Sequence, residues 1–71
     1  KRATTTLGER LRQARLAAKL TQQDLAEKAG LVVRSVANYE ADESVPGGDA
    51  LRRICEALPM SADALLGLEA R

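Results

Sequence analysis

An apolar pattern with helical spacing, interrupted at Gly30, is the feature of this sequence that most constrains its fold. The stretch TQQDLAEKAGLVVRSVANYE, residues 21–40, carries such a pattern on both sides of the glycine. The two expected inner faces are Leu25, Ala26 and Ala29 before the break, and Val32, Val36 and Tyr39 after it. Glycine adopts positive φ without a steric penalty, so the chain can turn sharply there. The pattern predicts two short helices that meet at a steep angle.

Capping patterns and helix breakers extend this prediction to the whole chain. The expected helices are about 7–19, 21–30, 33–41, 49–58 and 61–67. The chain has one Tyr and no Phe or Trp, so its core has to be built from Leu, Ala, Val and Ile, which favours helices over sheet. We expect an all-α, compact five-helix bundle at residues 7–67, a flexible N-terminal arm at 1–6 and a C-terminal tail at 68–71.

Several function classes fit this composition poorly. The sequence has no His, no Gly-rich phosphate loop and no cluster of metal-ligating residues, so we expect no enzymatic activity, no catalytic residues, no metal and no cofactor. Its lone Cys55 cannot form an internal disulfide and lies on an apolar helix face, where a small core residue is the simplest interpretation. No apolar run reaches membrane-spanning length. We expect a cytoplasmic protein with no membrane partner.

The charges are distributed unevenly along the chain. Residues 1–38 contain eight Lys and Arg against three acidic residues, a net charge of +5. Residues 39–71 contain three Arg against seven acidic residues, a net charge of −4. The basic half is compatible with a polyanionic partner and equally with an ordinary solvated helix face.

Taken together, these segments resemble the lambda-repressor-like (Cro and phage-repressor type) helix-turn-helix family. The resemblance runs from LGERLRQARLAAKLTQQDLAEKAG to SADALLG, roughly residues 7–67, and includes Val36, Tyr39, Glu40 and Pro46. It implies that the second and third helices form the helix-turn-helix. It also implies a transcriptional regulator, expected to be a repressor, that binds double-stranded operator DNA with the third helix in the major groove.

The resemblance implies roles for individual residues. The expected base-reading residues are Val33, Arg34, Ala37 and Asn38. The expected phosphate-binding residues are Thr21, Gln22, Arg15 and Lys19, of which Arg15 is also expected to form a structural ion pair with Glu40. Family members usually carry Ser or Thr at the position of Val32, which valine cannot replace as a cap, and a turn glycine at the position of Asp42.

Two further expectations concern partners. A homodimer on a palindromic operator is expected, and an additional C-terminal domain or protein partner outside this chain is possible under the same resemblance. The alternative is a protein–protein adaptor or antitoxin-like module that uses the same fold, with Val33, Ala37 and Ala41 as an apolar contact surface.

Overall fold

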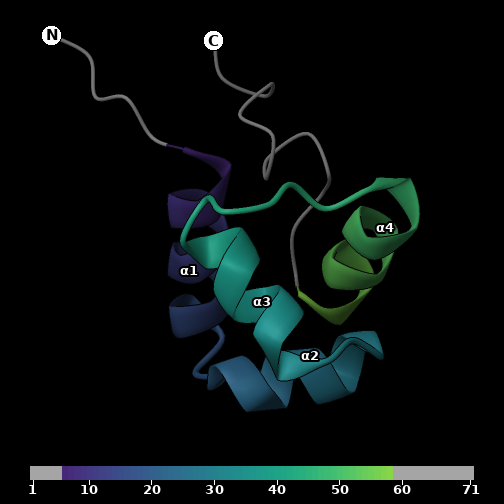
Figure 1. The fold of residues 1–71 in the computed structure, drawn as a ribbon. Coiled ribbons are helices and arrows are strands. Elements are labelled where there is room, and N and C mark those ends of the chain that lie inside the picture. Colours follow the sequence, from purple (N-terminus) through teal and green to yellow (C-terminus); the bar gives the residue numbers. More distant parts are fainter. Residues whose placement is uncertain (1–5, 59–71) are drawn as a thin grey trace, which may run out of the picture.

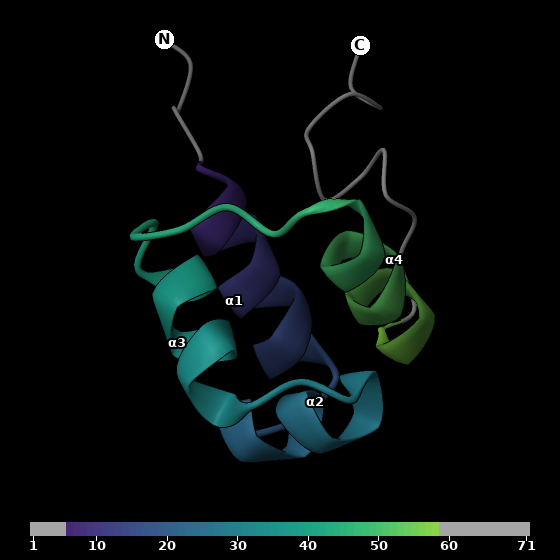
Figure 2. The same ribbon diagram turned by 45° about the vertical axis from the view of Figure 1, so that its right-hand side comes forward.

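The computed structural model describes residues 6–58, and this part of the chain is all-α (Figure 1). Its four helices are α1 (Leu7–Ala17), α2 (Gln22–Ala29), α3 (Val33–Glu40) and α4 (Gly48–Ala57). In Figures 1 and 2, α1 and α3 lie side by side, α2 runs across their ends, and α4 lies on the other side of the molecule. Helix α2 packs against both α3 and α4, and α1 packs against α3.

The prediction of a five-helix bundle is wrong, because residues 6–58 form four helices. Helix α4 ends at Ala57, and Leu58 has the extended backbone (φ −115°, ψ 149°) that a following proline favours. The expected fifth helix, 61–67, lies outside the described residues.

Each helix contributes one fully buried aliphatic side chain to a single core. These side chains are Leu11, Leu25, Val36 and Ile54. The expected inner face of α2 is buried as predicted, at Leu25, Ala26 and Ala29. The prediction was wrong for Val32, which is 67% exposed. Val32 precedes α3 with an extended backbone (φ −83°, ψ 150°), so the helical periodicity that buries Val36 does not reach it.

The turn between α2 and α3 has the geometry that the broken pattern predicts. Gly30 has φ +71°, in the left-handed region. The N–H of Leu31 donates to the carbonyl of Ala26 (2.8 Å) and the N–H of Gly30 donates to that of Glu27 (3.3 Å), which closes α2 with a Schellman motif. Leu31 then packs against the core in the angle between the two helices.

The same kind of closure ends α1 and α3, but without glycine. Lys19 (φ +62°) and Asp42 (φ +61°) occupy the left-handed positions. Helix α1 therefore ends at Ala17, whereas the sequence pattern predicts an end near Lys19. Residues other than glycine rarely adopt this backbone conformation, although Asp tolerates it better than most.

The side chain of Asp42 ties the end of α3 to the beginning of α1. Its Oδ1 accepts a hydrogen bond from the N–H of Gly8 (3.0 Å). A carboxylate is favourable at this place, because the first turn of a helix presents unpaired N–H groups and the positive end of the helix dipole. The contact is so close that a Cβ on Gly8 would lie 2.5 Å from the carbonyl oxygen of Tyr39.

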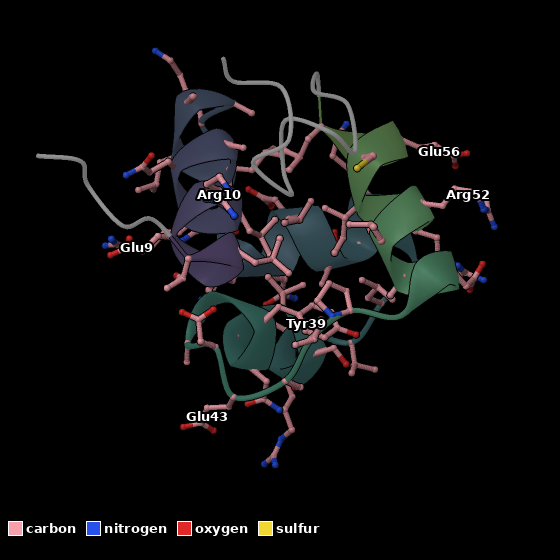
Figure 3. All side chains as sticks on the ribbon, turned by 90° about the horizontal axis from the view of Figure 1, so that it is seen from above. Glu9, Arg10, Tyr39, Glu43, Arg52 and Glu56 are labelled. Atoms are coloured by element: carbon pink, nitrogen blue, oxygen red, sulfur yellow. The ribbon has the colours of Figure 1, made fainter. Side chains whose placement is uncertain are left out.

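Helix α4 is amphipathic and completes the core. Cys55 packs against the core beside Leu51, and burial raises the pKa of its thiol. On the outer face, Arg52 and Glu56 extend away from the body of the molecule (Figure 3) and form an ion pair (3.1 Å). Within residues 6–58 no helix is long and apolar enough to cross a membrane.

Candidate nucleic-acid interface

The outer face of α3 gathers the residues that the sequence suggested for base reading. In Figure 1, α3 lies at the front of the molecule. Val33 is 44% exposed and Arg34 is exposed, whereas Ala37 and Asn38 are half-buried. These residues form two adjacent pairs, and the second pair follows the first by four residues. The helix therefore brings all of them to one face over little more than one turn.

Arg34 and Asn38 are the polar members of this face. They are four residues apart, so their side chains lie one above the other on the helix surface. Neither forms a side-chain hydrogen bond or ion pair with another residue in 6–58. The guanidinium offers a planar set of N–H donors and the amide offers one acceptor and two donors. Both groups can therefore bind a partner from outside the domain.

The beginning of α2 is held by a capping box. The Thr21 hydroxyl accepts a hydrogen bond from the N–H of Asp24 (3.0 Å), and the Asp24 carboxylate accepts one from the N–H of Thr21 (3.1 Å). Both groups are exposed. The Thr21 side chain thus has a structural function at the place where the sequence suggested a phosphate contact.

Gln22, the next residue, is fixed by α3. Its Nε2 donates to Glu40 Oε1 over 3.0 Å. A primary amide nitrogen carries two hydrogens, so this contact leaves the other N–H of Gln22 available. The structure thus positions a side-chain donor at the beginning of α2, close to the end of α3.

Glu40 also pairs with Arg15, and this pair is largely buried. Arg15 Nε donates to Glu40 Oε2, Arg15 Nη2 donates to Glu40 Oε1 (3.0 Å), and Arg15 Nη1 donates to the carbonyl of Leu20 (2.9 Å). The side chains are 10% and 4% exposed. The hydrogen bond with Glu40 raises the pKa of Arg15. All three guanidinium nitrogens of Arg15 donate within the protein, so its contact with α3 is structural.

Charge varies along this side of the molecule. Lys19 is exposed in the turn between α1 and α2, and Arg34 is exposed in the first half of α3. At the other end of α3, the exposed Asp42 and Glu43 follow, and Glu43 points away from the molecule in Figure 3. The first turn of α3 contains no acidic residue. A polyanion therefore meets a more favourable potential at the beginning of α3 than beyond its end.

Sequence reasoning missed three residues of this region. It assigned Val32 to the core, treated Asp42 only as a replaced glycine, and gave Gly8 no role. One feature of the sequence could have identified Val32 as exposed: it stands at the expected cap position of the third helix, and a cap residue lies outside the helix. The functions of Gly8 and Asp42 depend on a contact between residues 34 positions apart, which no local pattern reveals.

Comparison with known proteins identifies the fold family. A family model described as helix-turn-helix matches residues 11–65. The chain belongs to this helix-turn-helix family. The match and the relatives below confirm the resemblance to lambda-repressor-like domains.

Two relatives and one solved structure illustrate the family. The chain is 39% identical over 62 residues to the HTH-type transcriptional regulator ImmR of Bacillus subtilis (87% of this chain, 49% of the relative). It is 38% identical over 64 residues to the immunity repressor protein of Bacillus phage phi105 (90% and 44%). The P22 c2 repressor, solved in complex with a synthetic operator, has a similar structure (TM-score 0.87, 32% identity, 93% of this chain and 100% of that one). The chain spans about half the length of the curated relatives it matches.

Proposed function

We propose that this chain is the sequence-specific DNA-binding domain of a transcriptional repressor and that it reads double-stranded DNA with α3 in the major groove. The observation that carries the proposal is the outer face of α3, where Arg34 and Asn38 lie one turn apart without partners in residues 6–58. The relatives support it, because they are transcriptional regulators and repressors, and one solved neighbour is bound to an operator. These names give no support to an enzymatic activity.

The chemistry of the face suits base edges. Arg34 can donate two hydrogen bonds to O6 and N7 of a guanine, and Asn38 can pair with N6 and N7 of an adenine. Val33 can contact a thymine methyl group, and Ala37 is small enough to let the helix approach the base edges closely. In this arrangement the polar pair specifies sequence and the apolar pair adds shape complementarity.

Phosphate contacts are proposed for the beginning of α2. The free N–H of Gln22 and the N–H groups of the first turn can bind one phosphate there, and the helix dipole favours a negative charge. Lys19, exposed nearby, adds a long-range attraction. Thr21 can contact phosphate only in addition to its capping bond. Arg15 contributes chiefly by holding Glu40, and through it Gln22.

The proposed repressor acts as a homodimer on a palindromic operator. A single α3 presents few base contacts, and Asp42 and Glu43 repel phosphate beyond its end, so one domain alone should bind with modest affinity. Two domains related by a two-fold axis would read half-sites about one helical turn apart, roughly 34 Å. A footprint confined to one half-site at all protein concentrations would contradict the dimer.

Selection from a random duplex library, followed by a salt titration on the enriched sequence, tests the proposed function. We expect one enriched motif. Its affinity should fall with salt at a slope of about −0.9 for each phosphate neutralised. No enriched motif, together with binding that is equal for all duplexes or absent, would contradict the proposal. The adaptor alternative, with Val33, Ala37 and Ala41 as its contact surface, would then be preferred.

A further inference from the structure

Arg53 on α4 contacts the backbone of the turn between α2 and α3. Its Nη1 donates a hydrogen bond to the carbonyl oxygen of Gly30 over 3.3 Å. The guanidinium lies so close to this turn that a Cβ on Gly30 would be 2.9 Å from Nη1. The contact joins residues 23 positions apart, and it connects α4 to the helix-turn-helix.

The end of α2 is a favourable place for an arginine. The last carbonyl groups of a helix have no partner within the helix, and the helix dipole is negative there. Two neighbours on α4 hold Arg53 in this place. Its Nε donates to Asp49 Oδ2 (2.9 Å), and Ile54, the next residue, is fully buried in the core. The guanidinium is therefore fixed against Gly30 from the side of α4.

Helix α3 is held differently at its two ends. Glu40, its last residue, accepts hydrogen bonds from Arg15 on α1 and from Gln22 on α2. At its beginning, Val32 forms no capping hydrogen bond. The position of this end of α3, where Arg34 lies, therefore depends on the turn that precedes it.

We propose that Arg53 is a positioning residue for base reading. By holding the carbonyl of Gly30 it fixes the angle at which α3 leaves α2, and with it the place of Arg34 at the base edges. The inference rests on the proposed function. A bidentate contact with a base requires aligned donors, whereas attraction to phosphate changes slowly with distance. Loss of the Arg53 contact should therefore reduce discrimination more than it reduces binding to DNA of any sequence.

The test compares the affinity of Arg53→Ala for the selected operator and for a duplex changed at the base pair where Arg34→Ala removes discrimination. The ratio of the two affinities should fall about two- to tenfold, the factor that corresponds to one hydrogen bond. Arg52→Ala is the matched control. It removes the same charge from the next position, but Arg52 is bonded to Asp49 and Glu56 on its own helix. The control should keep the ratio.

The pattern of the loss separates positioning from stability. A loss of folded protein alone lowers the affinity for all duplexes by the same factor and leaves the ratio unchanged. A displaced beginning of α3 should instead reduce discrimination more at the base pair of Arg34 than at that of Asn38, which lies closer to the end held by Glu40. Arg53→Met keeps the aliphatic part of the side chain without its donors, and it should give the same result if alanine impairs folding.

Three results would overturn the inference. The ratio could be unchanged in the folded Arg53 variants, Arg52→Ala could lose as much discrimination, or the loss could be equal at the base pairs of Arg34 and Asn38. The proposed function would stand in each of these cases, because the unmutated chain would still select its motif. If no motif is selected at all, both proposals fail.

Discussion

Glu40 connects three helices through one carboxylate, accepting hydrogen bonds from Arg15 on α1 and from Gln22 on α2 while it ends α3. Its side chain is 4% exposed, so removal from water is costly unless these donors are present. The same argument applies to Arg15, whose side chain is 10% exposed. The pair therefore fixes how α3 is placed on α1 and α2.

Glu40→Ala should destabilise the domain more than Glu43→Ala. Removing one partner of a buried ion pair costs about 3–5 kcal/mol, and the lower end is expected because Arg15 keeps some contact with water. Glu43 is exposed, and its removal should change the free energy of unfolding by about 0–1 kcal/mol. Urea unfolding of both variants measures the difference. Equal midpoints would show that the buried pair does not stabilise the fold.

At the residue scale, the sequence correctly predicted the burial or the backbone conformation of residues that depend only on their own helix or turn. Val36 is buried and Gly30 adopts positive φ, as the apolar spacing and the turn chemistry predict. It failed at Val32, because a pattern of apolar residues does not reveal where the helix begins. Lys19 in the left-handed conformation was equally hidden, since no local preference favours lysine there.

At the scale of the elements, α1 and α3 approach each other closely where α1 begins and α3 ends. A Cβ on Gly8 would lie 2.5 Å from the Tyr39 carbonyl oxygen and 2.6 Å from that of Glu40, both of them backbone atoms. The hydrogen bond from Gly8 to Asp42 reinforces the contact. A glycine within a helix normally reduces its stability, so its presence in α1 reflects this crossing rather than helix preference.

Gly8→Ala should therefore destabilise the domain, although alanine is the better helix former. The backbone of α3 would have to move, and overpacking of this kind costs about 1–3 kcal/mol. Gly48→Ala is the matched control, because Gly48 begins α4 and a Cβ there would meet nothing within 4 Å. That variant should be neutral or more stable by up to about 1 kcal/mol. Thermal unfolding of both variants checks the prediction, and a stabilised Gly8→Ala would contradict the close crossing.

At the scale of the whole molecule, the sequence predicted the all-α fold of residues 6–58, the order of the four helices in that range and the face of α3 that points outward. It did not predict how closely α1 lies against α3, because that approach depends on the contact between Gly8 and Asp42, which are 34 positions apart. For the same reason, only part of the arrangement of the candidate site follows from the sequence. Residues exposed on one helix follow from periodicity, whereas the hydrogen bond between Gln22 and Glu40 joins two helices.

The functional account predicts that base reading and electrostatic attraction can be separated by mutation. Arg34→Ala and Asn38→Ala should each remove discrimination at one operator position, because each residue is proposed to recognise one base. Gln22→Ala should instead weaken binding to all sequences about equally, since phosphate contacts carry no sequence information. Arg52→Ala is a control for the loss of an exposed arginine, because Arg52 lies on α4 and extends away from the molecule (Figure 3).

The most direct test of the central claim measures the affinity of Arg34→Ala and Asn38→Ala for the selected operator and for its single-base variants at two salt concentrations. We expect each substitution to cost about 1–3 kcal/mol on the operator and to make one position accept other bases. The Arg52→Ala control should keep both affinity and preference. If Arg34→Ala and Asn38→Ala also bound the operator and its variants as the unmutated chain does, α3 would not be the reading element.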